Sequence, residues 1–250
     1  MTPIKIIANW KMNGSHEDII SWIDYFQNNV EIKNQINCIL CPPLCYLDTV
    51  KKIVLNNKLD LHLGSQDVYA DLDHPSTGGV SGRMIKDLGC NYVLIGHSER
   101  RIHFQENEDI LLGKINSAIK NKLNIIFCVG ETFEQREGGI TKKIIKKQLR
   151  ILRGLPVGLI SVAYEPVWSI GTGKIPSLES IEDVHQVIKS GLKDYFTNKK
   201  DIPVYYGGSV NLDNAEMIMK LDSVDGLLIG AASLDSSSFS GIVNKITAKK

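Results

Sequence analysis

Eight short apolar segments, separated by longer amphipathic ones, constrain the fold of this chain more than any other feature. Each is three to six residues long and rich in Ile, Val and Leu. Continuous apolar runs of this length are typical of strands buried on both faces, as in a parallel sheet. The predicted strands are Ile4–Ala8, Cys38–Cys41, Leu59–Gly64, Tyr92–Ile95, Ile125–Val129, Ile160–Tyr164, Val204–Tyr206 and Gly226–Ile229.

The segments between these runs have helical periodicity. After Ser15, a residue type that caps helices, apolar side chains recur at helical spacing at Ile19, Trp22, Ile23 and Phe26. Apolar stripes predict further helices within 144–152, 181–192 and 215–219. Four lysines between 142 and 147 could indicate nucleic-acid binding. Because the adjacent apolar stripe is intact and no aromatic residues interleave, we interpret them as a solvated helix face.

Strands that alternate with helices, without a linker or low-complexity break, predict one closed α/β unit. We expect a single (β/α)8 barrel of parallel strands that spans residues 1–250 as one domain, because barrels of this length are common. The alternative is an open doubly wound sheet, which usually has a glycine-rich turn after its first strand. Here the first strand leads into Asn9–Asn13, which is polar but not glycine-rich, so the barrel is favoured.

Composition excludes several other classes. With 29 basic and 28 acidic residues, the net charge of +1 gives no support for nucleic-acid or membrane-surface binding. No apolar stretch approaches a membrane span, and no signal peptide is expected, which predicts a cytoplasmic protein. The five cysteines are an odd number, as expected for reduced thiols. Cys38, Cys41 and Cys45 are interpreted as buried structural thiols, because no second pair completes a zinc site.

Candidate catalytic residues follow the predicted strands, since barrels carry their chemistry at the carboxyl ends of strands. Glu165 follows the sixth apolar run, where a carboxylate is costly to bury unless it is used or paired. His97 follows the fourth run, before a helix start that would disfavour its protonated form. Asn9 and Lys11 follow the first, and a lysine there would attract an anionic substrate. Each alone is more commonly structural or simply exposed, and the run after His97, Glu99 to Arg101, could be a solvated charge run.

The segment after Glu165 has the pattern of a hinged lid. Pro166 stiffens one end and Gly171–Gly173 frees the other, while residues 167–170 are apolar enough to exclude water when the lid is closed. The Gly-Thr-Gly-Lys tail is not a Walker A loop, because Trp168 stands where its first glycine is required and Ile175 where Ser or Thr is required.

Small-residue turns follow the seventh and eighth predicted strands, at Gly207–Ser209 and Gly230–Ala232. If each leads to a helix N-terminus, their backbone N–H groups can bind an anion, and the loops after these two strands are the usual phosphate site of a barrel. A base, a neutral donor, a cation, a phosphate cradle and a lid together predict proton transfer next to the carbonyl of a small phosphorylated substrate. The sequence carries neither a metal cluster nor a dinucleotide fingerprint.

Five of these segments resemble the triosephosphate isomerase family, in register from about residue 4 to about residue 245. They are Asn9–Asn13, Gly96–Arg101, Ala163–Trp168, Ile170–Gly173 and Tyr206–Val210. The resemblance implies a TIM barrel that interconverts dihydroxyacetone phosphate and glyceraldehyde 3-phosphate, in glycolysis and gluconeogenesis, without cofactor or metal. It also implies a homodimer in which the loop after the third strand inserts into the neighbour.

The resemblance assigns a role to each site residue. Glu165 would move the proton, neutral His97 would polarise the carbonyl, Lys11 would supply charge and Asn9 would orient the substrate. Glu99 would support Lys11 at a distance from the reacting carbons. The phosphate donors would be Gly171, Ser209, Gly230 and Ala231.

Three positions depart from the family pattern. Ala231 replaces a usual glycine and brings a methyl group close to the phosphate unless its φ is negative. Ser169 replaces a common lid alanine, which we expect to be harmless, and Gly79 replaces a usual acidic residue, so a dimer-interface charge is missing. A barrel enzyme for a larger phosphorylated substrate is disfavoured by bulky Trp168 and by the pair of Asn9 and Lys11. A non-catalytic barrel would be expected to lack Glu165, His97 or Lys11, and all three are present.

Overall fold

The protein closes an eight-stranded parallel barrel, as the sequence predicts. The computed structural model describes residues 3–32, 35–70, 75–170, 174–196 and 201–247. Every strand pairs with its neighbours in chain order, and β8 pairs with β1 to close the ring. The strands are β1 (Ile4–Asn9), β2 (Ile36–Cys41), β3 (Leu61–Ser65), β4 (Tyr92–Ile95), β5 (Asn124–Val129), β6 (Ile160–Tyr164), β7 (Val204–Tyr206) and β8 (Gly226–Ile229).

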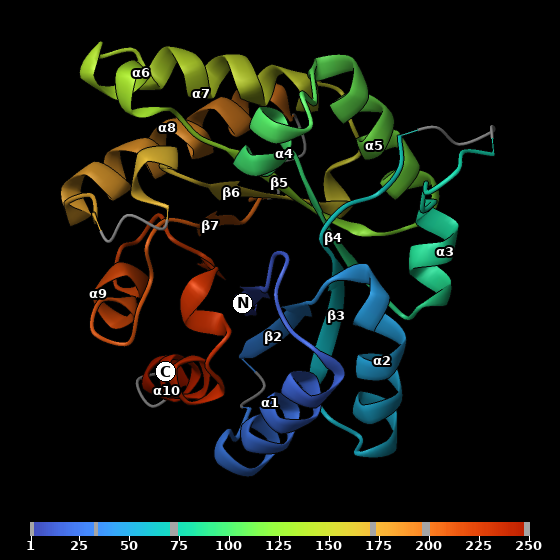
Figure 1. Cartoon of the computed structure of the whole chain (residues 1–250). Coiled ribbons are helices and arrows are strands. Elements are labelled where there is room, and N and C mark those ends of the chain that lie inside the picture. The colour runs from blue at the N-terminus through green and yellow to red at the C-terminus, as the bar shows by residue number, and fades with distance from the viewer. Residues whose placement is uncertain (1–2, 33–34, 71–74, 171–173, 197–200, 248–250) are drawn as a thin grey trace.

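Helices surround the strands on the outside of the barrel (Figure 1). They are α1 (His16–Asn29), α2 (Leu47–Asn56), α3 (Gly82–Asp87), α4 (Ser98–His103), α5 (Glu108–Lys120), α6 (Phe133–Glu137), α7 (Thr141–Leu149), α8 (Leu178–Tyr195), α9 (Ala215–Met219) and α10 (Ser236–Thr247). The first and last helices lie side by side (Figure 1), where the ring centroids of Trp22 and Phe239 are 5.4 Å apart. The outer layer therefore closes at the same place as the sheet.

Element boundaries differ from the prediction where local capping decides them. Ser15 caps α1 as expected, and its side chain accepts a hydrogen bond from the backbone N–H of Asp18. The third strand begins at Leu61 instead of Leu59, because the N–H of Leu59 donates to the carbonyl of Val54 and belongs to the turn that ends α2. The predicted helix at 144–152 becomes α7 followed by a 3-10 turn, Arg150–Leu152.

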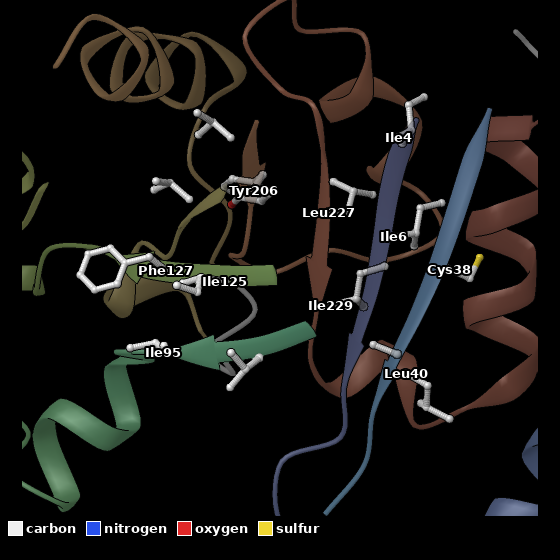
Figure 2. Packing of buried hydrophobic residues seen from close by; sticks show 14 of the residues in the cluster. Ile4, Ile6, Cys38, Leu40, Ile95, Ile125, Phe127, Tyr206, Leu227 and Ile229 are labelled. Atoms are coloured by element: carbon white, nitrogen blue, oxygen red, sulfur yellow. The ribbon is translucent and has the colours of Figure 1, made fainter. Parts of the chain in front are cut away.

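Alternate strand residues divide between two apolar layers. Ile7, Ile39, Leu94 and Ala163 pack inside the barrel with the other inward-facing side chains. Their neighbours in the strands, including Ile6, pack against the helices in the larger layer, part of which Figure 2 shows. Since successive strand residues point to opposite faces, the parity that buries Ile7 also directs Asn9 into the barrel mouth.

Exposure corrects one interpretation of the cysteines. Cys38, Cys41, Cys90 and Cys128 are buried, but Cys45 is exposed, because it lies in the 3-10 turn Leu44–Tyr46 beyond the end of β2. Among the residues that the structure describes, no group of three or more potential ligands could hold a metal ion. The same part of the chain contains no helix that is both long and apolar enough to span a bilayer. The four lysines of α7 are exposed, which fits a solvated helix face.

Candidate active site

A cavity of about 420 Å³ lies at the carboxyl ends of the strands. It brings together most of the residues singled out from the sequence, which come from β1, β4, β6, β7 and β8 and the turns after them. The predicted residues that line it are Asn9, Lys11, His97, Glu165, Ser209, Gly230 and Ala231. Glu99 lies behind Lys11, and Gly171 falls outside the described residues.

Glu165 is 2% exposed and is held from both sides. One carboxylate oxygen, Oε1, lies 3.1 Å from Nε2 of His97, and the other accepts a hydrogen bond of 3.1 Å from the backbone N–H of Ser98. Its own N–H donates to the carbonyl of Val129 at 2.7 Å. A Cβ atom on Gly130 would lie 1.7 Å from the carbonyl oxygen of Glu165, so only glycine allows these two backbone segments to approach so closely.

His97 follows a sharp turn at the end of β4, where Gly96 has a φ of +73°. The ring nitrogen Nδ1 accepts a hydrogen bond of 3.2 Å from the backbone N–H of Glu99, at the start of α4. An acceptor at Nδ1 fits the neutral imidazole with its proton on Nε2, which faces Glu165. The ring is therefore arranged to donate one hydrogen bond into the cavity without carrying a charge.

Lys11 has an unusual backbone conformation, with a φ of 53°. Its N–H donates to Oδ1 of Asn9 at 3.1 Å, and its carbonyl accepts a 2.8 Å hydrogen bond from the side-chain amide of Gln66. The same amide donates to the carbonyl of Cys41 at 2.9 Å. Gln66, which the sequence analysis missed, thus ties the loop after β1 to the end of β2. A polar residue two positions after the third apolar run was the available signal.

The Nζ atom of Lys11 lies 2.7 Å from Oε1 of Glu99. Partial burial opposes ionisation of Glu99, but the hydrogen bond from Lys11 and the nearby positive charges outweigh it, so the pKa of Glu99 lies below its ordinary value. An ionised Glu99 fixes the direction of the Lys11 side chain, whose ammonium group lines the cavity.

The basic residues after Glu99 are not a solvated charge run. Arg100 pairs with Asp67 at 2.8 Å, while Arg101 donates to the carbonyls of Gly96 and Cys128 at 2.7 and 2.9 Å. Burial lowers the pKa of Arg101 from its ordinary value. Arg101 therefore joins the end of β4 to the end of β5 below His97 and Glu165.

A second buried carboxylate, Glu131, holds the start of the predicted lid. It is fully buried and accepts hydrogen bonds from the hydroxyl of Tyr164 at 3.1 Å and from Nε1 of Trp168 at 3.0 Å. Arg136 approaches the same oxygen at 3.4 Å and lies over the Trp168 ring. Glu131 was not predicted from the sequence, although it shares the signal that identified Glu165, a carboxylate just after an apolar run.

The two turns predicted to bind phosphate differ from each other. After β8, Gly230 leads directly into the 3-10 turn Ala231–Ser233, and Ala231 has no positive φ, so its methyl group adds no backbone strain. After β7, the expectation of an adjacent helix is wrong, because α9 begins only at Ala215. The side chain of Asn214 instead holds the turn by donating to the carbonyl of Ser209 at 3.0 Å.

Comparison with known proteins agrees with this geometry. The sequence profile described as "Triosephosphate isomerase" matches residues 4–246. The chain is 39% identical to the triosephosphate isomerase of Thermodesulfovibrio yellowstonii, over 95% of this chain and 97% of that protein. It is 40% identical to the triosephosphate isomerase of Lawsonia intracellularis, over 96% and 97% of the two chains. The chain therefore belongs to the triosephosphate isomerase family.

Proposed function

We propose that Glu165 is the base in the reaction of this family, the interconversion of dihydroxyacetone phosphate and D-glyceraldehyde 3-phosphate. The observation that carries the proposal is the opposition of the Glu165 carboxylate and His97 Nε2, 3.1 Å apart at the wall of one cavity. A substrate that enters between them has a proton acceptor next to its reacting carbons and a neutral hydrogen-bond donor next to the oxygen that those carbons carry. Proton transfer through an enediolate needs these two groups.

His97 acts on the carbonyl oxygen. In the proposed complex its Nε2–H group donates to substrate oxygen instead of to Glu165, and it stabilises the enediolate as negative charge develops there. Lys11 adds a positive charge on the same side, and Asn9, which is 5% exposed, orients the substrate hydroxyl. Glu99 acts through Lys11 and does not reach the reacting carbons.

The phosphate group is bound by backbone N–H groups of Ser209, Gly230 and Ala231. The Gly230 turn follows β8, which pairs with β1, and a Cβ atom on Gly230 would lie 3.7 Å from Cε of Lys11. Gly171 is assigned as a fourth donor on the family resemblance alone. Ile170 and Ile175 line the cavity and support exclusion of water, which protects the enediolate from loss of phosphate.

The test is a coupled assay of the purified, EDTA-treated chain at neutral pH, with each triose phosphate as substrate and without added metal. We expect isomerisation in both directions. Absence of activity on both substrates would overturn the proposal. A larger phosphorylated aldose serves as the comparison, and faster turnover of that compound would favour the rival barrel enzyme.

We propose that the chain is a homodimer through the face beside Lys11. Met12 is 96% exposed there and, with Leu44 and Tyr69, lines a groove of about 530 Å³ near the loop at residues 75–80. Three exposed apolar side chains at one groove support a protein–protein interface. Gly79 packs against the ring of Tyr69, where a Cβ would lie 3.3 Å away, so the missing acidic residue leaves a closely packed turn.

Mass in solution tests the dimer directly. We expect the mass of two chains for the wild type and a concentration-dependent shift toward one chain for Met12→Glu, because a charge would be buried at the interface. Glu17→Lys, at an exposed position of α1, is a control that should not shift the mass. A monomeric wild type at all concentrations would contradict the proposal.

We propose a cytoplasmic location and a role in glycolysis and gluconeogenesis. All five cysteines are free, which supports a reducing compartment. Cell fractionation with an antibody against the chain tests the location, and the isomerase reaction itself is the step that joins the two triose phosphates in those pathways.

A further inference from the structure

Ser169 of the lid makes contacts that an alanine could not make. The residue is fully buried in the 3-10 turn Val167–Ser169. Its hydroxyl accepts a hydrogen bond of 3.3 Å from the backbone N–H of Ser209 and donates one of 2.7 Å to the carbonyl of Lys174. Its carbonyl accepts a hydrogen bond of 2.6 Å from the hydroxyl of Ser209. The expectation that this serine is a neutral replacement does not account for these bonds.

The donor that Ser169 engages is one that the proposed phosphate site needs. A backbone N–H group has one hydrogen, and a single hydrogen bond normally uses it. In this structure the hydroxyl oxygen of Ser169 accepts from the Ser209 N–H, as a phosphate oxygen would in the proposed complex. Because Ser169 is fully buried, solvent water does not compete for this contact.

We propose that Ser169 is a positioning residue that occupies the Ser209 phosphate donor in the empty enzyme, so that a phosphate group must displace its hydroxyl in order to bind. The inference rests on the proposed phosphate site. It makes the lid hydroxyl a determinant of specificity, because only a strongly accepting, charged group gains enough from this donor to replace the existing bond.

The hydroxyl therefore lowers the affinity of every ligand that binds through the Ser209 N–H group. Ser169→Ala removes the competing acceptor and leaves the Ser209 N–H in place. Exchange of one net hydrogen bond corresponds to about a three- to tenfold change in binding. We expect the inhibition constant of inorganic phosphate, and the KM of both triose phosphates, to fall by about that factor.

The experiment compares wild type, Ser169→Ala and Ser161→Ala. The control also removes a buried serine hydroxyl that donates to a backbone carbonyl, that of Ile125 at 2.8 Å, but it lies outside the cavity. Phosphate inhibition is measured for all three, together with kcat/KM for D-glyceraldehyde, which has no phosphate. We expect tighter phosphate inhibition in Ser169→Ala alone and equal kcat/KM for D-glyceraldehyde in all three.

Each outcome decides the inference. Phosphate inhibition that is unchanged or weaker in Ser169→Ala overturns the role of the hydroxyl, while activity and phosphate inhibition of the wild type leave the proposed function intact. Equal changes for D-glyceraldehyde and phosphate indicate a general structural effect and also overturn it. A wild type that isomerises triose phosphates but is not inhibited by phosphate contradicts the phosphate site, and the inference fails with it.

Discussion

The two sides of the cavity differ in their functional groups, which are side chains on one side and backbone N–H groups on the other. On the β4 and β6 side, Glu165 and His97 are 2% and 6% exposed and are fixed by hydrogen bonds from the backbone of α4 and by close chain contact at Gly130. On the β7 and β8 side, the groups assigned to phosphate are backbone N–H donors in turns, and the side chain at position 231 is exposed. Side-chain chemistry requires particular residues, whereas a cradle of backbone donors requires only a conformation.

The largest expected effect comes from a change on the β4 and β6 side of the cavity. Glu165→Asp withdraws the carboxylate by one methylene from the reacting carbons. We expect turnover to fall by about 10²- to 10⁴-fold, the usual range for a displaced general base. Inhibition by inorganic phosphate should change by less than about twofold, because separated sites act nearly independently. Steady-state kinetics measures both, and a comparable loss of phosphate inhibition would indicate a structural role for Glu165.

The backbone contact beneath Glu165 gives the next largest effect. Gly130→Ala places a methyl group 1.7 Å from the carbonyl oxygen of Glu165, a clash that only backbone movement relieves. We expect the free energy of unfolding to fall by about 3 kcal/mol or more, with loss of turnover in the folded fraction. Gly158→Ala is the matched control, because nothing lies within 4 Å of its added Cβ. Equal urea-unfolding curves for the two variants would contradict the close contact.

The free energy of unfolding at acid pH should depend on His185. His185 on α8 is fully buried between the rings of Tyr164 and Tyr206, and burial lowers its pKa from 6.5 to about 4. Between these values the unfolded chain binds a proton that the folded chain does not, so stability is lost as the pH falls from about 6.5 toward 4.

The expected loss for this residue between pH 7.5 and pH 5.0 is about 2 kcal/mol. Urea unfolding of wild type and His185→Gln at fixed protein concentration measures it as the difference between the two pH slopes. Lys189→Gln, a change one turn further along α8, should leave most of the slope. A His185→Gln variant with the wild-type pH slope would show that another group is responsible.

The smallest effect is expected for a change on the β7 and β8 side of the cavity. Ala231→Gly restores the usual family residue, but Ala231 already has a conformation that alanine adopts without strain. We expect phosphate inhibition to change by less than about twofold and stability to fall by about 0.5 kcal/mol through the added freedom of the unfolded chain. A large gain in phosphate affinity would mean that the methyl group obstructs the site.

Residues at strand ends show why part of the site was predictable. Glu165 and His97 were identified because a titratable side chain after a buried strand is costly without a function or a partner. The same reasoning applied to the fifth strand would have found Glu131, and its extension to any polar side chain after a strand would have found Gln66. Their partners, the carbonyl of Lys11 and the indole of Trp168, are 55 and 37 residues away in sequence and could not be assigned from it.

The sequence by itself determined the barrel, because eight apolar runs alternate with segments of helical periodicity. It also determined which side chains can donate or accept a proton. Only the tertiary structure decided what those groups face. The approach of His97 Nε2 to Glu165, the close packing of Gly130 on Glu165 and the bond between Ser169 and Ser209 all join different strand ends. Hydrogen bonds and close contacts depend on distances of a few ångströms between segments, and a closed sheet fixes those distances only when all its strands have paired.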